Sequence, residues 1–312
     1  MKKLFTVVVL FIIGFESFAQ ISSGIKATDI AALRKKTIYV VIQGGTPILT
    51  NVKYSKVVGE NESTGKKEKD VEEATTDTEY NKAIRFAMTN FWRVNKAEFI
   101  TEEEFEEKRL VNNNFFIHIM EYKTKDKVPA KLNILAITKG GPKYKKVDKM
   151  PILAAIPLSY LNIPEAEYVY KIPAFVQFLQ DHLDYEFQNA PVDEKKMLKH
   201  YNDKSKEIKD GTLYVVSEDL TKKVFDIDVI HKFYKGDVMI VEPAEIEKAI
   251  KMQDAHVTFV HVVSPRKSVD SGLCRKYVFA AKGGELLYMS EHNVSKGGEE
   301  GLQDGDFKSF SK

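Results

Sequence analysis

Two histidines, His118 and His261, are the residues whose type and repeated position could support chemistry. They stand at the same place in two similar apolar runs, F-F-I-H-I and T-F-V-H-V. An imidazole can act as a general base or bind a metal ion. Neither run has further His, Cys, Asp or Glu residues at metal-ligand spacing. The sequence therefore predicts no metal site and no cofactor, and it keeps both histidines as candidate binding residues on buried strands.

Two aromatic residues form a second repeated pair. Trp92, the single tryptophan, ends the run N-F-W, and Tyr234 ends the run K-F-Y. Such residues can stack on a ligand, but at the end of a helix they usually pack onto a sheet. They are the other two candidate binding residues. No G-x-S-x-G elbow and no separated pair of glycosidase carboxylates accompanies them. No catalytic residue is predicted, which favours a function other than catalysis.

Both pairs belong to an internal duplication. Residues 115–141 align on 258–284 without a gap and end in T-K-G-G and A-K-G-G. Upstream, T-I-Y-V-V at 37–41 matches T-L-Y-V-V at 212–216, and F-I-T-E at 99–102 resembles M-I-V-E at 239–242. Matches in the same order indicate a repeat. Copies of this length are typical of tandem domains rather than of a solenoid.

Each copy is predicted to be a β-α-β-α-β-β-β unit. In the first copy, Asp77 is expected to cap a helix that ends near Phe91; residues 220–234 form a looser version of this helix. The Lys-Gly-Gly motif is expected to make the same hairpin turn in both copies. The strands are predicted at 37–41, 98–101, 115–122, 132–138 and 150–158, and at 212–216, 238–241, 258–263, 276–281 and 285–290; the second helices at 103–111 and 243–251; and a third, amphipathic helix at 173–189.

The predicted fold class is α+β, with two tandem domains that each contain a mixed five-stranded sheet with helices packed on it. A first domain at 20–190 carries a charged insertion at 51–79, predicted to be a mobile loop. A linker helix at 191–210 leads to a second domain at 211–312, which is expected to fold alone or nearly so. Strand 115–122 is apolar on both faces, so both faces of its sheet must be covered. We expect the first two helices on one face, and the third helix, the other domain or a partner on the other.

The N-terminus predicts export. Met1-Lys2-Lys3, an apolar run at 4–15 and Ser17-Phe18-Ala19 together make a signal peptide over residues 1–19. The apolar run is too short to span a bilayer comfortably, and no integral membrane segment is predicted after cleavage. A single cysteine, Cys274, allows no intrachain disulfide. A formal net charge of +2 gives no reason to expect a nucleic-acid partner.

The order of elements resembles a known family. The β-α-β-α-β-β-β unit, with an aromatic residue ending its first helix and F-I before an acidic short helix, resembles the amino-terminal domain of TolB. It is similar also to the periplasmic domain of CsgG and related envelope lipoproteins. The resemblance covers 36–190 and 211–312 separately. It implies a non-catalytic role in the periplasm, peripheral to the outer membrane. The TolB propeller and the lipid-anchoring cysteine of the CsgG group have no counterpart, so no residue roles are carried over.

The leading hypothesis is an exported envelope protein that mediates protein–protein binding or assembly in the periplasm. Its predicted partner is another envelope protein, bound at a sheet edge or in the groove between the domains. One alternative is a small-ligand-binding protein that uses the inter-domain cleft, which an apolar cavity near Trp92 or His118 would favour. The other is a hydrolase with a site at the domain junction, which would require a pocket of titratable groups with shifted pKa values.

Overall fold

The computed structural model describes residues 26–44, 77–125, 129–190, 192–266, 271–295 and 298–310. The predicted signal peptide and nearly all of the insertion predicted at 51–79 therefore lie outside the described residues. Within these ranges, no helix has both the length and the apolar character needed to cross a membrane.

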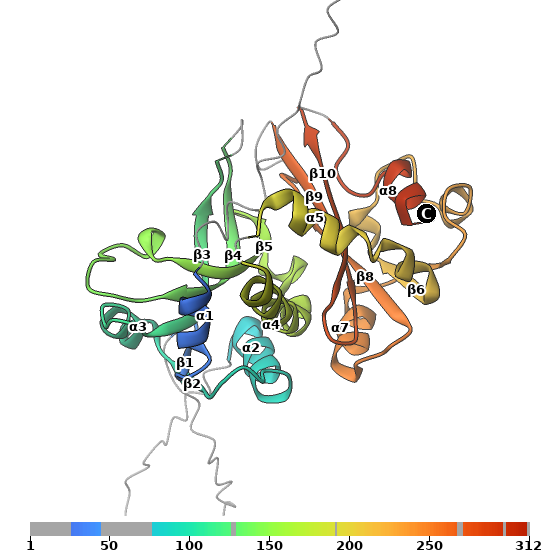
Figure 1. Cartoon of the computed structure of the whole chain (residues 1–312). Helices are drawn as coiled ribbons and strands as arrows, with labels where there is room; N and C mark the ends of the chain where they lie inside the picture. Colours follow the sequence, from blue (N-terminus) through green and yellow to red (C-terminus); the bar gives the residue numbers. More distant parts are fainter. Residues whose placement is uncertain are drawn as a thin grey trace, which may run out of the picture.

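Two sheets of five strands form the framework (Figure 1). The first has the order β2-β1-β3-β4-β5 and the second the order β10-β9-β8-β6-β7, which is the same topology. In each sheet the first three strands of the unit run parallel and the last two are added antiparallel. The strands are β1 (Ile38–Val41), β2 (Ala97–Ile100), β3 (Phe115–Lys123), β4 (Lys131–Lys139) and β5 (Ile152–Tyr160), and β6 (Thr212–Val215), β7 (Asp237–Ile240), β8 (Val257–Val263), β9 (Gly272–Ala280) and β10 (Leu286–Val294). The predicted fold class, two related mixed-sheet units, is confirmed.

The helices of the described residues are short except for α2 and α4. They are α1 (Ala27–Leu33), α2 (Glu79–Asn90), α3 (Glu102–Lys108), α4 (Ile172–Asn189), α5 (Glu194–Asn202), α6 (Ile227–Ile230), α7 (Pro243–Met252) and α8 (Asp304–Phe310). Among the 3-10 turns are η1 (Val147–Lys149), η3 (Val169–Lys171) and η4 (Ser205–Asp210). The sequence prediction missed α1, and the region predicted as one linker helix contains α5 and η4.

The helices α2 and α3 cover opposite faces of the first sheet. Ile84 of α2 belongs to the same core as Phe115 and Ile117, whereas Phe105 of α3 packs with Phe116. Strands β2 and β3 lie on opposite sides of β1, so right-handed connections place the two helices on opposite faces. The expectation that both helices cover one face was wrong.

Helix α4 lies between the two sheets. It packs on α2 and β5 of its own unit. From the same helix, Phe175 and Phe178 contact Phe279 of the second sheet, with ring centroids 5.5 and 5.6 Å apart. Figure 1 shows α4 and α7 between the sheets, with α3 on the outer left and α8 on the outer right. The units therefore share one hydrophobic core across their junction.

A second core lies on the outer face of the second sheet, under α8. Phe307 and Phe310 of this helix pack around Tyr234. Beside them, the buried Lys276 ammonium donates to both carboxylate oxygens of Asp306, at 2.9 and 2.7 Å. The C-terminal helix is thus fastened to the sheet by apolar packing and by a buried ion pair.

Two local predictions about helix ends and length were wrong. Thr78, and not Asp77, caps α2, because its hydroxyl accepts from the N–H of Asn81; Asp77 instead accepts from the Asn81 side chain. In the second unit the helix expected at 220–234 is reduced to α6. There Leu220 forms a bridge with Leu302, which holds the start of this segment in an extended conformation.

The Lys-Gly-Gly motif makes different structures in the two units. Gly283 and Gly284 have φ of +77° and +62° and form the tight turn between β9 and β10. Gly140 and Gly141 do not adopt positive φ. A Cβ at Gly140 would lie 2.7 Å from the carbonyl oxygen of Arg109, so glycine here permits close contact with the end of α3. The chain then continues through a longer connection over residues 140–151.

Strand pairing also corrects the alignment of the second strands by one residue. Tyr39 pairs with Glu98, and the equivalent Tyr214 pairs with Met239. Met239 therefore corresponds to Glu98 and not to Phe99.

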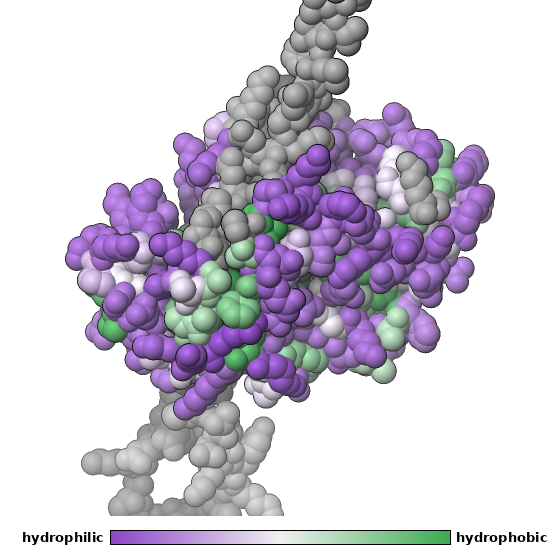
Figure 2. All heavy atoms as spheres, viewed as in Figure 1, coloured by the Kyte–Doolittle hydropathy of each residue, from purple (hydrophilic) through white to green (hydrophobic). Residues whose placement is uncertain are grey.

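On the molecule as a whole, Figure 2 shows a mainly hydrophilic surface in which hydrophobic colour gathers near α1 and α4. In this region Arg34 lies over the half-exposed Phe187 ring, 4.5 Å from its centroid.

Candidate functional site

His118 lies on β3, on the face of the first sheet that α3 partly covers. Its Nε2 is 3.0 Å from the hydroxyl oxygen of Thr138, and its ring centroid is 4.8 Å from that of Phe105. The side chain is buried. Burial lowers the pKa of His118 to about 4, because the surroundings disfavour the charged imidazolium. The ring is therefore neutral at neutral pH.

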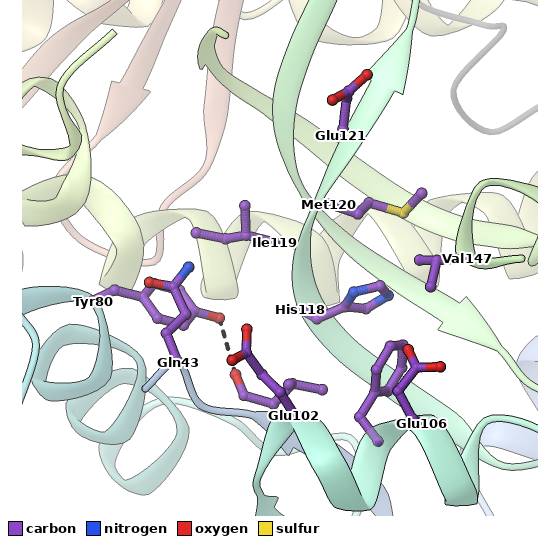
Figure 3. A pocket seen from close by; sticks show the side chains of 11 residues that line it. Gln43, Tyr80, Glu102, Glu106, His118, Ile119, Met120, Glu121 and Val147 are labelled. Atoms are coloured by element: carbon purple, nitrogen blue, oxygen red, sulfur yellow. Dashed lines mark hydrogen bonds between the residues drawn. The ribbon is translucent and has the colours of Figure 1, made fainter. Parts of the chain in front are cut away.

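A pocket of about 270 Å³ opens beside this histidine. Its lining comes from the end of β1 and the residues after it, from α2, α3 and η1, and from the second half of β3. Figure 3 shows His118, Met120 and Val147 around one end, and Tyr80, Gln43 and Glu102 around the other. The lining residues are Val41, Gln43, Tyr80, Glu102, Phe105, Glu106, His118, Ile119, Met120, Glu121 and Val147.

The pocket lining combines apolar side chains with carboxylates. Of its three glutamates, Glu106 accepts two hydrogen bonds from Arg109, at 2.8 and 2.5 Å, and Glu121 pairs with Lys131 at 2.7 Å. Glu102 begins α3, where the helix dipole favours a carboxylate. Because Arg109 and Lys131 already pair with two of these carboxylates, Glu102 is the one that would meet a donor or a positive charge on an incoming apolar group.

The contact between His118 and Thr138 has the geometry of a base beside a hydroxyl nucleophile. Thr138, however, has 0% exposure and does not line the pocket. A substrate in the pocket would not reach that oxygen. The hydrogen bond instead satisfies a buried imidazole, as buried polar groups require.

His261 occupies the same repeat position in the second unit, but it lies inside the junction. Its Nε2 donates to the carbonyl oxygen of Pro157 in the first unit, at 2.9 Å. The Phe175 ring of α4 lies 4.8 Å away, and the Tyr277 ring stacks at 5.8 Å. Burial, and then the charge of Lys171, lower the pKa of His261 well below its usual value. This histidine also stays neutral, and it joins the two units.

The junction around His261 is filled by side chains. The turn η3, which leads into α4, packs against α7. Lys171 of this turn is 1% exposed, and its Nζ is 3.8 Å from Oδ2 of Asp219. Arg266 donates to Oδ1 of Asp219 at 2.6 Å and pairs with Glu167 at 2.9 Å. Around His261, the junction between the units is thus filled by aromatic packing and ion pairs. This junction is where the two sequence-based alternatives predict a ligand cleft or a hydrolase site.

Trp92 and Tyr234 are both buried, and neither lines the pocket. The Trp92 indole N–H donates to Oδ1 of Asn95 at 2.9 Å. The Tyr234 hydroxyl donates to the carbonyl oxygen of Ile208 at 3.2 Å. Each aromatic residue thus lies in its own unit's core, so the four candidate residues do not form one site.

Sequence reasoning found His118 but missed the residues around it, chiefly Glu102, Phe105, Met120 and Val147. The sequence offered one indication of this site. Phe116, His118 and Met120 alternate along β3, so they lie on one face of the strand, the face on which α3 packs. Val147 comes from the 140–151 connection, for which the sequence predicted a turn between two strands but no site residue. The described residues contain no group of three or more potential ligands that could hold a metal ion.

The described geometry is therefore that of a pocket with a neutral imidazole in its wall. In comparisons with known proteins, no protein family, no curated protein and no solved structure was found to match the chain.

Proposed function

We propose that the chain is a non-catalytic binding protein of the bacterial envelope, and that the His118 pocket receives a side chain of a partner protein. The observation that carries the proposal is the difference between the two units. In the second unit the equivalent face, around His261, is occupied by Phe175 and the turn that precedes it. At the equivalent position of the first unit, His118 borders an open pocket instead.

The occupied junction indicates what kind of partner would fit. Phe175 places an aromatic ring against the histidine, and Lys171, four residues earlier, places a buried ammonium near a carboxylate. A partner helix that begins with a basic residue and an aromatic residue at this spacing would meet the apolar lining residues and Glu102 of the first unit. Aromatic anchors in pockets dominate many protein interfaces.

The volume of the pocket supports a side chain over a larger ligand. Small-molecule sites usually enclose about 300–1,000 Å³, and this pocket measures about 270 Å³. A small ligand beside His118 remains the alternative, and it would be bound in the first unit rather than between the units.

The envelope location rests on sequence. The signal peptide at 1–19 and the resemblance to TolB amino-terminal and CsgG-like domains support export to the periplasm. They also support a partner that is itself an envelope protein.

A pair of matched variants tests this proposal. Val147→Trp fills the mouth of the pocket, and Val111→Trp makes the same change at an exposed position after α3 that does not line it. We expect a partner from envelope extracts to co-purify in stoichiometric amount with the wild type and with V111W, and to be lost with V147W. Equal recovery with both variants would reject the pocket as the binding site.

A further inference from the structure

The strand β7 forms the outer edge of the second sheet. Within the described chain it pairs only with β6, so one side of its backbone has no partner strand. Unpaired strand edges readily add another strand, and proteins usually protect them with charged residues, prolines or covering elements. The composition of this edge therefore shows whether it is protected.

This edge carries exposed apolar side chains. On the strand, Met239 is 49% exposed and Ile240 is 36% exposed. Beside it, α6 packs against β7. Ile227, the first residue of α6, is 37% exposed, and Phe225, two residues before it, is 66% exposed. Four of the eight large hydrophobic side chains that are most exposed in the described structure thus lie on this strand, on the adjoining helix or just before that helix.

The duplication supplies an internal comparison. The strand β2 is the equivalent edge of the first sheet, and its register with β1 places Glu98 where β7 has Met239. At the next position Phe99 is only partly exposed and lies beneath the Arg85 guanidinium, 4.8 Å from its ring centroid. The first unit therefore has a charged edge and a shielded aromatic residue, and the second unit has two exposed apolar residues. The two units thus have the same strand order, but the edge strand is protected in the first unit and unprotected in the second.

We propose that two copies of this chain associate through β7, which pairs antiparallel with its counterpart and extends the second sheet across a two-fold axis. Such a contact is isologous, because the same patch serves both copies. It would bury Met239 and Ile240, and it would place Phe225 and Ile227 beside the new strand pair.

The charges around β7 favour a second copy as the occupant. Exposed Lys232 and Lys235 precede the strand, and exposed Glu242 and Glu245 follow it. In an antiparallel pair the start of each strand lies beside the end of the other, so these lysines approach the partner's glutamates at both ends. Asp237, at the first position of the strand, reduces this attraction without reversing it. Opposite charges across strands contribute to such pairing.

Light scattering of the purified chain over a range of concentrations tests the proposal. We expect the wild type to have twice the mass of one chain, and Met239→Glu, which copies the edge of the first unit, to fall to one chain mass. Met252→Glu makes the same change at a methionine that is 71% exposed at the end of α7, and it should keep the double mass. Equal melting temperatures would show that both variants are folded.

A wild type with the mass of one chain at every concentration would overturn the proposal. So would a double mass that persists in Met239→Glu. A monomeric wild type whose β7 binds another protein also counts against it, because the occupant would then not be a second copy. None of these results depends on the His118 pocket, which lies on the first unit.

Discussion

At the scale of single residues, the repeated histidines differ in surroundings and not in charge. His118 and His261 are both buried and neutral, yet one borders a pocket and the other joins the two units. The sequence placed both on apolar strands correctly, because alternation along a strand is a local property. It could not separate their roles, because the difference comes from α4, which covers only one of them.

The buried histidines predict an acid-sensitive fold. Burial lowers the pKa of His118 and of His182 to about 4, whereas an unfolded histidine binds its proton near pH 6.5. Between these values the unfolded chain binds more protons, so the free energy of unfolding falls as the pH falls from about 6.5 towards 4. Full loss of one such contribution costs about 3 kcal/mol. In His118→Gln, denaturant unfolding across this range should show a smaller loss than in the wild type. An unchanged pH dependence would contradict this account of His118.

The ion pair under α8 predicts a contrast between two aspartates of one helix. Asp306→Asn leaves the Lys276 ammonium buried without a counter-charge, which should lower the free energy of unfolding by about 3–5 kcal/mol. Asp304→Asn removes an exposed pair with Lys308 and should leave the free energy of unfolding nearly unchanged, because solvent screens an exposed pair. Urea denaturation of both variants measures the difference. Similar losses of unfolding free energy in the two variants would show that the buried pair stabilises the fold no more than the exposed pair does.

At the scale of elements, the sequence predicted most strands and the long helices, because their periodicity is strong. It failed where a contact distant in sequence decides the outcome. The bridge between Leu220 and Leu302 shortens the first helix of the second unit, and Gly140, in contact with Arg109, begins a longer connection between β4 and β5 where a tight glycine turn was expected. The pocket is lined by both α3 and the 140–151 connection, so it could not be predicted from either segment alone.

The equivalent helices α3 and α7 begin differently, which gives a test at this scale. Thr101 and Glu104 form a capping box at the start of α3, whereas Glu242 makes no side-chain cap for α7. Thr101→Ala should lower the free energy of unfolding by about 1 kcal/mol, and Glu242→Thr should raise it by about 0.5–1 kcal/mol. Thermal melting of both variants checks the signs. Shifts in the same direction would reject the assignment of the caps.

At the scale of the whole molecule, the duplication has produced two sheets with one shared core. Both sheets were predictable from the repeat, but the position of α4 between them was not. The expectation that 211–312 folds alone assumed that each unit covers its own sheet. In the structure, Phe175 and Phe178 of the first unit cover part of the second sheet.

The shared core predicts a single unfolding transition for the full chain. Phe175→Ala removes an aromatic ring from the junction and should lower the free energy of unfolding by about 3–5 kcal/mol while keeping one transition. The fragment 211–312 should lack cooperative melting, and a fragment that begins at residue 172 and so includes α4 should melt more cooperatively. Calorimetry measures all three. Independent, cooperative melting of 211–312 would restore the division into separately folding domains.

The most direct test of the pocket as a binding site is photo-crosslinking in living cells of the organism that makes the protein. A photoreactive phenylalanine analogue replaces Glu102, an exposed residue of α3 that lines the pocket, and the same analogue at exposed Val111 is the control. We predict one dominant adduct at 102 with another envelope protein, joined at a helix that carries an aromatic residue, and no such adduct at 111. The same adducts at both positions, or none at 102, would contradict the proposal that the His118 pocket receives a partner's side chain.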